Sequence, residues 1–399
     1  MLTYPIWIGR ILFYGVRRSG NHSNSLVWLA VQERFALGAA LQLAKPLPSA
    51  SKIVGPLIRP EAMTLLRPVD IAQTTPTGSA VAIAIAEGYG FGQILDCVLL
   101  RRGFNHVYAL SFADGRRAVA RLCARRPRGA PNTEFEAALL THLKAAGAAV
   151  AALLPTRDGA AAISMSLPEG ARPLMLFEYL DGDPPGEDLT DIEATGKSLA
   201  LLHEAGQDYN GPTSRYLLEL PLLLDESLHR MYSAPTLDEA LRSKFTSIAG
   251  RVAERVAAIP ELTRVNCHGD CHGSNNFMTD GPEGTRIASF FDFDDAGPGW
   301  LAYELAVYLW SMLQRTASAE PDAVTRERWH RYIAGYRSVR TIGDADFAAI
   351  ALFVVVRHFW LMGEYAGRVD VWGTQAMPKT WLQKQVELLT AWESLQTPD

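Results

Sequence analysis

The first half of the chain carries the alternation of apolar and polar residues that is typical of a small antiparallel sheet. Apolar and β-branched runs occupy residues 95–100 and 106–112, separated by a short turn that contains Gly103. The pair Asp114-Gly115 is a hairpin signal, and it leads into a third run at 117–122. We therefore predict three consecutive antiparallel strands.

A helical pattern follows the third strand at residues 133–146, where Leu139 and Leu143 recur at helical spacing. After a short strand, residues 172–180 read Arg-Pro-Leu-Met-Leu-Phe-Glu-Tyr-Leu and run into a break rich in proline and glycine. An apolar strand that ends in such a break suits a hinge between two lobes.

The second half of the chain is predominantly helical in pattern. A strand is expected at 286–291, and helices are expected at 191–206, 222–259 (broken near Pro235), 301–313, 324–337, 344–367 and 381–392. Residues 348–363 are apolar enough to suggest a membrane span. Because Arg357 and His358 interrupt this run and it is too short to span a bilayer, we expect a core helix. Strands followed by helices indicate an α+β fold.

The strongest chemical signal is the segment 268–275, which reads His-Gly-Asp-Cys-His-Gly-Ser-Asn. Transfer of a γ-phosphoryl group requires charge neutralisation, alignment and a group that accepts the hydroxyl proton. Asp270 is the candidate base. Asn275 and Asp292 offer the hard oxygen ligands that suit Mg²⁺. The alternative interpretation is that Asp270 and Asn275 only stabilise a turn.

Protein kinases carry the same residue types in the same order. Their base and a metal ligand lie in H-R-D-x-x-x-x-N, and a second metal ligand opens D-F-G. Asp270 and Asn275 stand at the same five-residue offset, and Asp292 occupies the position of the D-F-G aspartate. The sequence therefore predicts a phosphotransferase that uses ATP and Mg²⁺.

The nucleotide-binding residues are expected upstream of this segment. Gly103 and Asn105, in the first turn, are expected over the phosphates, although the turn has no G-x-G-x-x-G pattern. Arg121 stands where a kinase has its lysine, and arginine can hold phosphate oxygens with two donors. Glu136 is the expected partner of Arg121, with Glu134 as the alternative.

The expected adenine contact is the backbone of the hinge, at Glu178, Tyr179 and Leu180. Aromatic residues in and near the later helices are candidates for lining an acceptor pocket, with core packing as the alternative. They are Trp310, Trp329, Trp360, Tyr365 and Trp372.

With these motifs in place, residues 94–393 resemble the aminoglycoside phosphotransferase and choline kinase-like family. The resemblance also rests on Asn-His-Val-Tyr at 105–108, Leu-Ala-Leu-Leu-His at 199–203 and Phe-Phe-Asp-Phe-Asp-Asp at 290–295. It implies a bilobal protein kinase-like fold, Mg-ATP as the donor and a small-molecule hydroxyl as the acceptor. It also implies that Asp270 is the base, that Asn275 and Asp292 bind metal, and that Arg121 meets the nucleotide phosphates.

Three positions depart from the family pattern. Arg121 replaces the commoner lysine, as in the branch that includes stress-response Ser/Thr kinases. Gly273 replaces a proline, which alters the stiffness of the loop. Glu304 stands where aspartate is more common, and we expect it to be structural.

The acceptor class implied by the resemblance is an aminoglycoside, an amino alcohol or a homoserine-like molecule. Two alternatives remain open. One is a Ser/Thr protein kinase of the stress-response type with a protein substrate. The other is a nucleotide-binding, pseudokinase-like module, which the intact catalytic residues disfavour.

Composition adds limits to this interpretation. The chain of 399 residues is long enough for two lobes. Its net charge of −5, without a basic stripe, argues against a nucleic acid partner. Four cysteines do not form a disulfide framework, so the cytoplasm is the expected location, and no membrane partner is expected.

Four segments are expected along the chain. Residues 1–62 contain no repeat, helix-capping pattern or catalytic motif, and we expect a dispensable extension or a start at Met63. Residues 63–93 lead into the small lobe, 94–180 form the nucleotide-binding lobe, and 181–399 form the lobe for catalysis and acceptor binding.

Overall fold

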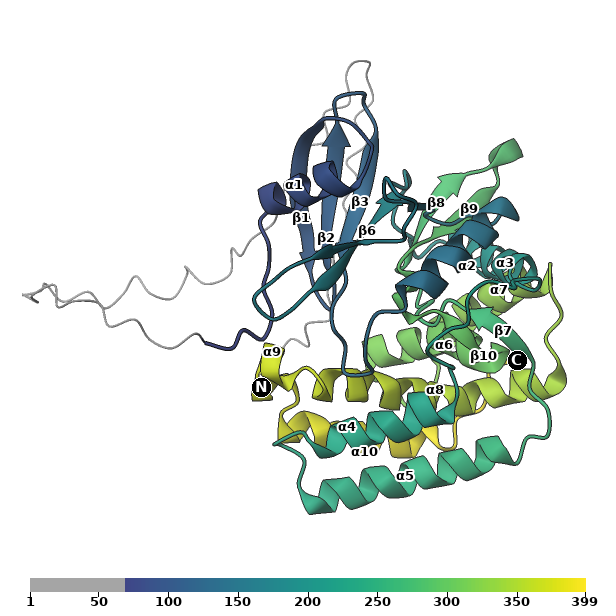
Figure 1. Cartoon of the computed structure of the whole chain (residues 1–399). Coiled ribbons are helices and arrows are strands. Elements are labelled where there is room, and N and C mark those ends of the chain that lie inside the picture. The colour runs from purple at the N-terminus through teal and green to yellow at the C-terminus, as the bar shows by residue number, and fades with distance from the viewer. Residues whose placement is uncertain (1–68) are drawn as a thin grey trace, which may run out of the picture. The chain divides into compact units, whose positions relative to one another are not determined.

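The structure, a computed structural model, describes residues 69–399. The expectations for residues 1–62, and for the beginning of the 63–93 segment, lie outside the described residues. Within the described part a sheet-containing lobe stands over a larger helical lobe (Figure 1). The α+β, two-lobed architecture expected from the sequence is confirmed.

The sheet of the first lobe has six strands, all paired antiparallel, in the order β1-β2-β3-β6-β4, with β5 also paired to β6. Their bounds are β1 Ile94–Arg102, β2 His106–Phe112, β3 Arg117–Leu122, β4 Leu153–Leu154, β5 Ile163–Met165 and β6 Arg172–Glu178. The three strands predicted from alternation are β1, β2 and β3, and each pairs with the next.

A helix that the sequence analysis did not predict, α1 (Gly78–Gly88), covers one face of this sheet (Figure 1). Its buried residues Val81 and Ile85 pack with Ala120 and Leu122 of β3 in a core of their own. Because side chains alternate along a strand, Arg121 of β3 is directed to the opposite face.

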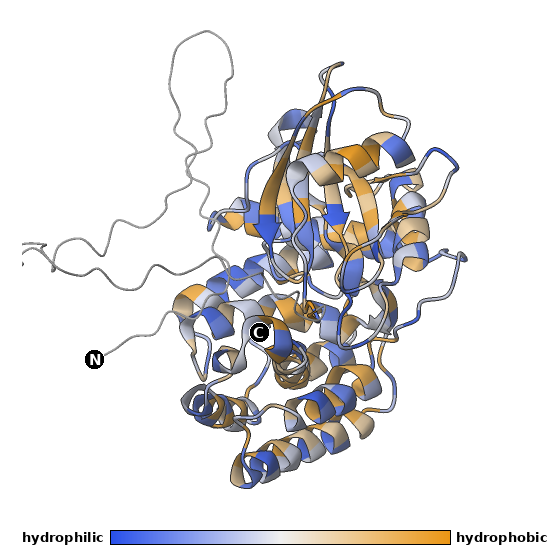
Figure 2. Ribbon diagram, turned by 60° about the vertical axis from the view of Figure 1, so that its left-hand side comes forward, coloured by the Kyte–Doolittle hydropathy of each residue, from blue (hydrophilic) through white to orange (hydrophobic). Residues whose placement is uncertain are grey.

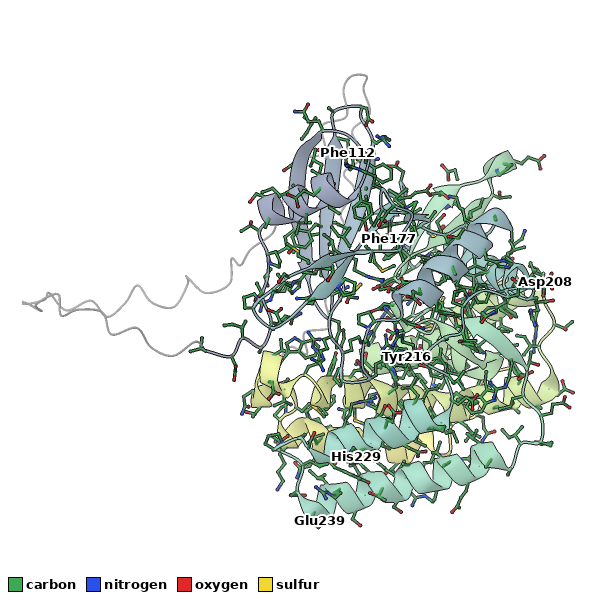
Figure 3. The ribbon with its side chains drawn as sticks, in the orientation of Figure 1. Phe112, Phe177, Asp208, Tyr216, His229 and Glu239 are labelled. Atoms are coloured by element: carbon green, nitrogen blue, oxygen red, sulfur yellow. The ribbon has the colours of Figure 1, made fainter. Side chains whose placement is uncertain are left out.

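That opposite face packs against α2 (Thr133–Ala145). Met175 and Phe177 of β6 belong there to the same core as Phe135 and Leu139 of α2. Figure 3 marks Phe177 in the lower part of the sheet and Glu239 at the start of α5 in the helical lobe. The charged Arg121 therefore lies in a largely apolar layer between sheet and helix.

The helical lobe confirms the predicted helices to within a few residues. Their bounds are α3 Leu189–Ala205, α4 Glu226–Tyr232, α5 Glu239–Ala257, α6 Leu301–Thr316, α7 Ala323–Arg337, α8 Asp344–Ala366 and α10 Lys379–Trp392. The short helix α9, Val369–Trp372, was not predicted. A π-helical turn, Pro221–Asp225, precedes α4. The expected break near Pro235 separates α4 from α5, where Asp238 caps the new helix by accepting from Leu241 N at 2.9 Å.

Hydropathy explains how two of these helices pack. Blue and orange alternate along α5, the lowest helix, because only one of its faces is buried (Figure 2). In contrast, α8 is long and apolar enough to cross a membrane by length and composition, yet 83% of its apolar window is buried inside the fold. It is the core helix that the sequence predicts.

Two short two-stranded antiparallel sheets hold the loops that carry the predicted chemistry. One pairs β7 (Arg264–Cys267) with β10 (Gly297–Trp300), and the other pairs β8 (Asn276–Asp280) with β9 (Arg286–Phe290). The loop 268–275 runs from β7 to β8, and the loop 291–296 runs from β9 to β10. Since each loop connects the two small sheets, the sheets bring the two loops together.

Candidate active site

The loop after β7 is fixed mainly by hydrogen bonds from its backbone to the side chain of Glu304. The carboxylate of Glu304, on α6 and fully buried, accepts hydrogen bonds from His268 N and Gly269 N, both at 2.9 Å. Gly269 has a φ of +82°, and a Cβ there would collide with the carbonyl oxygen of Asp295. The ring of His268 meets Phe291 O at 2.9 Å. The two loops are thus held against each other by contacts that tolerate little change.

Asp270, the predicted base, has both carboxylate oxygens engaged. Asn275 Nδ2 donates to Asp270 Oδ2 at 3.0 Å and to its backbone oxygen at 3.0 Å. Arg357, from α8, donates to Oδ1. Burial raises the pKa of Asp270, but the nearby His272, Arg357 and His268 outweigh it, and the net shift of the pKa is downward. The carboxylate is therefore held ionised.

Asp292, which with Asn275 is a predicted metal ligand, follows β9 in a left-handed conformation with φ +68° and ψ +57°. This conformation is uncommon for a residue other than glycine and turns the side chain out of the line of the strand. Burial raises the pKa of Asp292 to about 7, and the nearby carboxylate of Asp294 adds to the shift against the opposing Arg121. Burial and the neighbouring carboxylate thus both oppose the ionised form of Asp292 at this corner of the site.

The donor set at this corner fits a hard divalent cation. Asn275 holds Asp270 through its Nδ2. Its Oδ1 accepts no hydrogen bond from residues 69–399 and is free to face a cation. Asn275 Oδ1 and the carboxylate of Asp292 are oxygen ligands of the kind that Mg²⁺ prefers. Among the described residues no three or more His, Cys, Asp or Glu side chains lie close enough together to hold a metal ion by themselves. A cation held here would need phosphate or water oxygens to complete its shell.

Arg121 connects the nucleotide side of the site to this corner. Its Nη2 lies 2.5 Å from Glu136 Oε2, with the two side chains 5% and 3% exposed. Its Nη1 lies 3.4 Å from Asp292 Oδ1. Glu134, the alternative partner in the sequence analysis, is exposed. The structure thus brings Arg121, Glu136 and Asp292 together across 171 residues of sequence.

The turn between β1 and β2 reaches the same region. Gly103 N donates to Asn105 O at 3.0 Å within the turn. Asn105 donates to Asp294 Oδ2 at 2.8 Å and accepts from Ala124 N at 2.8 Å. The amide of Asn105 is thus engaged with the protein and ties the turn to the loop 291–296. Its predicted contact with the nucleotide stays a prediction.

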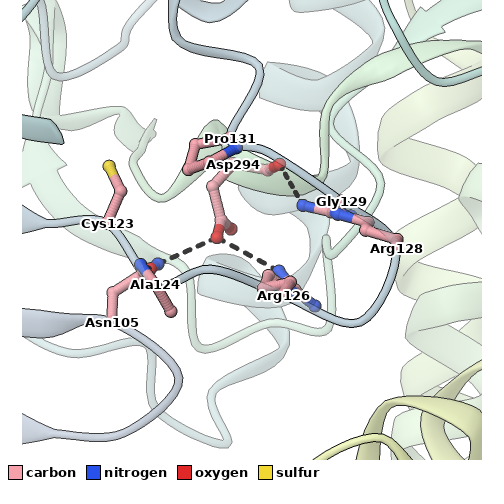
Figure 4. A pocket seen from close by; sticks show the side chains of 8 residues that line it. All are labelled: Asn105, Cys123, Ala124, Arg126, Arg128, Gly129, Pro131 and Asp294. Atoms are coloured by element: carbon pink, nitrogen blue, oxygen red, sulfur yellow. Dashed lines mark hydrogen bonds and ion pairs between the residues drawn. The ribbon is translucent and has the colours of Figure 1, made fainter. Parts of the chain in front are cut away.

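Two arginines that were not predicted as site residues, Arg126 and Arg128, lie between β3 and α2. Arg126 Nη1 lies 3.1 Å from Asp294 Oδ2 and 2.8 Å from Asp295 Oδ1, and Arg128 also pairs with Asp295. Arg126, Arg128 and Asp294 line part of a small pocket (Figure 4). The available signal was the basic run Ala-Arg-Arg-Pro-Arg at 124–128, directly after a predicted strand.

The predicted hinge residues leave the end of β6. Glu178 pairs with Lys144 at 2.9 Å, and Tyr179 lies under the guanidinium of Arg117, 4.0 Å from the ring centroid. Leu180 follows them, and three residues later the chain pairs with β8 of the helical lobe. The three residues lie where the chain crosses between lobes, and their contact with adenine stays a prediction.

Most of the aromatic candidates belong to the core. Trp310, Trp329 and Trp360 are buried, while Trp372 is 37% exposed. Tyr365 and Trp372 contact each other, with ring centroids 5.4 Å apart. Core packing therefore accounts for the three buried tryptophans.

Comparison with known proteins agrees with this architecture. Residues 96–342 match the phosphotransferase enzyme family, abbreviated APH. An uncharacterized protein of Deinococcus radiodurans is 35% identical over 316 residues, which cover 79% of this chain and 90% of that protein. The homoserine kinase of Pseudomonas aeruginosa is 28% identical over 293 residues, covering 72% of this chain and 86% of the kinase.

Among solved structures, the amicoumacin kinase hAmiN, in complex with AMP-PNP, Ca²⁺ and Ami, has a TM-score of 0.61 at 20% identity. The match covers 77% of this chain and 92% of that one. The family match and the fold thus define a phosphotransferase with a protein kinase-like fold. The chain belongs to the phosphotransferase enzyme family.

Proposed function

We propose that this protein transfers the γ-phosphoryl group of Mg-ATP to a hydroxyl of a small molecule, with Asp270 as the base. The observation that carries the proposal is the convergence of Asp270, Asn275 and Asp292 from two loops, with Arg121 3.4 Å from Asp292. These groups supply a proton acceptor, oxygen ligands for a cation and a charged donor for phosphate in one site.

The proposed roles follow from the contacts of each side chain. Asp270 accepts a hydrogen bond from the acceptor hydroxyl and takes its proton as the new oxygen–phosphorus bond forms and the bond to ADP breaks. Arg121, oriented by Glu136, donates to phosphate oxygens. Asn275 Oδ1 and Asp292 would hold Mg²⁺, which when bound neutralises charge on the phosphates. The Gly103 turn covers the phosphates, and the backbone of 178–180 meets the adenine.

The proposed acceptor class is an aminoglycoside, an amino alcohol or a homoserine-like molecule. Support comes from the homoserine kinase and the amicoumacin kinase that the chain resembles in sequence or in fold. We place the reaction in the cytoplasm. The four cysteines are all free thiols, which agrees with a reducing compartment.

The test is Mg-dependent ADP formation by the purified full chain, with a panel of aminoglycosides, amino alcohols, homoserine and small sugars and with a generic protein substrate. Turnover that a small molecule stimulates, and that Asp270→Asn abolishes, supports the proposal and identifies the acceptor class. Phosphate found on the chain itself or on the protein substrate would favour a protein kinase. ATP binding without turnover on the whole panel would favour a binding module.

A further inference from the structure

An arginine lies in the middle of the long apolar helix α8. Arg357 belongs to α8 and is only 2% exposed, with valines directly before it in the sequence. A buried charge is costly unless it is paired and hydrogen-bonded. Its partners therefore indicate what this residue does.

The guanidinium of Arg357 is directed at the catalytic loop. Nη2 donates to Asp270 Oδ1, and Nη1 donates to Gly269 O at 3.0 Å. Nη1 also lies 3.3 Å from the hydroxyl of Tyr303 on α6. Both the carboxylate of the proposed base and the backbone just before it are thus held by one rigid, planar group.

Aromatic rings fix the orientation of the same group. The guanidinium carbon lies 4.1 Å from the ring centroid of Trp360 and 5.0 Å from that of Trp310. Within the described residues Nε of Arg357 has no hydrogen-bond partner. The two rings and the contacts of the two Nη groups together set the orientation of the guanidinium.

The carboxylate of Asp270 is consequently held from two sides. Oδ1 is bound by Arg357, while Oδ2 accepts from Asn275 Nδ2 at 3.0 Å and lies 3.5 Å from His272 Nε2. A carboxylate offers about four lone-pair sites, so the two hydrogen bonds from Arg357 and Asn275 leave about two for other partners, an incoming hydroxyl among them. The direction from which the acceptor approaches is therefore restricted.

We infer that Arg357 is a positioning residue for phosphoryl transfer, which fixes the plane of the Asp270 carboxylate and anchors the loop through Gly269 O. This inference rests on the proposed function. Loss of the guanidinium would let the carboxylate rotate, and a misplacement of about 1 Å costs on the order of 10² in rate. Arg357→Met should therefore lower kcat about 100-fold and leave the KM for ATP unchanged, because Arg357 contacts no proposed nucleotide-binding residue.

A double-mutant cycle separates positioning from a general structural role. ADP formation from Mg-ATP is measured for the wild type, Asp270→Asn, Arg357→Met and the double variant. The best acceptor of the panel is used, or water if no acceptor stimulates turnover. If Arg357 acts through Asp270, adding Arg357→Met to Asp270→Asn lowers kcat by less than about 3-fold. Multiplying losses, or a normal kcat in Arg357→Met, would overturn the inference.

Hydrogen exchange of residues 267–276 in the nucleotide-free protein gives a readout that does not depend on turnover. Exchange should become faster in Arg357→Met, because Gly269 O loses its donor, and should stay near wild type in Arg340→Met. Arg340 lies in the connection between α7 and α8 and pairs with Glu204 at 3.0 Å. Unchanged exchange in Arg357→Met would also contradict the inference.

If Arg357→Met does not fold, Arg357→Lys keeps the charge and tests the geometry. An ammonium group cannot contact Asp270 and Gly269 O with a planar pair of donors, so a partial loss of kcat is expected. Full activity in Arg357→Lys would overturn the inference, because the charge without the planar pair of donors would then be sufficient. Full activity in Asp270→Asn would instead remove the base assignment, and with it the proposed function, whatever Arg357 does.

Discussion

The buried pair between Arg121 and Glu136 gives a sharp test of how this site is held together. The change is Glu136→Gln, which preserves size and hydrogen bonding but removes the negative charge. Both side chains are at most 5% exposed, and their closest atoms lie 2.5 Å apart. After the substitution Arg121 remains buried, with Asp292 at 3.4 Å as its nearest remaining carboxylate.

The size of the effect follows from the burial of the pair. Two unit charges about 4 Å apart interact by roughly 4 kcal/mol at an effective dielectric constant of about 20. Removal of one partner from a buried pair typically costs about 3–5 kcal/mol. Since Asp292 partly compensates Arg121, we expect the free energy of unfolding to fall by about 3 kcal/mol.

The assay is urea unfolding of the full chain at about pH 8. That pH is chosen because burial raises the pKa of Glu136, against the opposing effect of Arg121, and the carboxylate must be ionised. Glu134→Gln is the matched control, since Glu134 lies in the same helical turn but is exposed. Its effect should stay within about 0.5 kcal/mol.

A decrease in the free energy of unfolding of less than about 1 kcal/mol for Glu136→Gln, or no larger than that of Glu134→Gln, would contradict this expectation. The double change Arg121→Met with Glu136→Leu should recover much of the stability, because an apolar replacement of a buried ion pair is often neutral. That variant should nevertheless bind Mg-ATP poorly, since the phosphate donor is gone.

Three further outcomes are expected. Asp270→Asn should retain nucleotide binding and lose transfer by about 10³, and near-normal turnover would remove Asp270 as the base. Asp292→Ala should raise the Mg²⁺ concentration needed for nucleotide binding, and an unchanged Mg²⁺ titration would exclude Asp292 as a ligand. Burial lowers the pKa of His358 to about 4, and its Nδ1 accepts from Trp310 Nε1 at 3.1 Å while Nε2 faces Gln385 at 2.8 Å. Because the pKa is lowered in the folded state, His358 contributes stability that is present above pH 6.5 and is lost as the pH falls toward 4, with about 2 kcal/mol lost by pH 5. His358→Gln should flatten this part of the curve of unfolding free energy against pH. An identical curve would contradict the neutral state of the buried His358.

Local patterns determined the elements that the sequence predicts correctly. The strands β1 to β3 follow from alternation and from the turn at Asp114-Gly115, which act over a few residues. Asp270 and Asn275 are five residues apart, so their relation can be recognised from the sequence alone. The helix α1 was not predicted, because Val81, Ile83 and Ile85 alternate with alanine in a strand-like pattern. The alanines nevertheless favour a helix, and packing against the sheet stabilises it.

Tertiary structure decided the partners of those residues. Arg357 reaches Asp270 across 87 positions, and Arg126 reaches Asp294 across 168. In the sequence Arg357 is only an interruption of an apolar run, and Arg126 only part of a basic one. The sequence identifies Asp270, Asn275 and Asp292 as candidates for the proposed chemistry, because their identity and spacing are local features. Only the tertiary structure decides which charged side chains are buried as pairs. A buried charge loses favourable hydration, and a partner of opposite charge from a distant element compensates this loss of free energy.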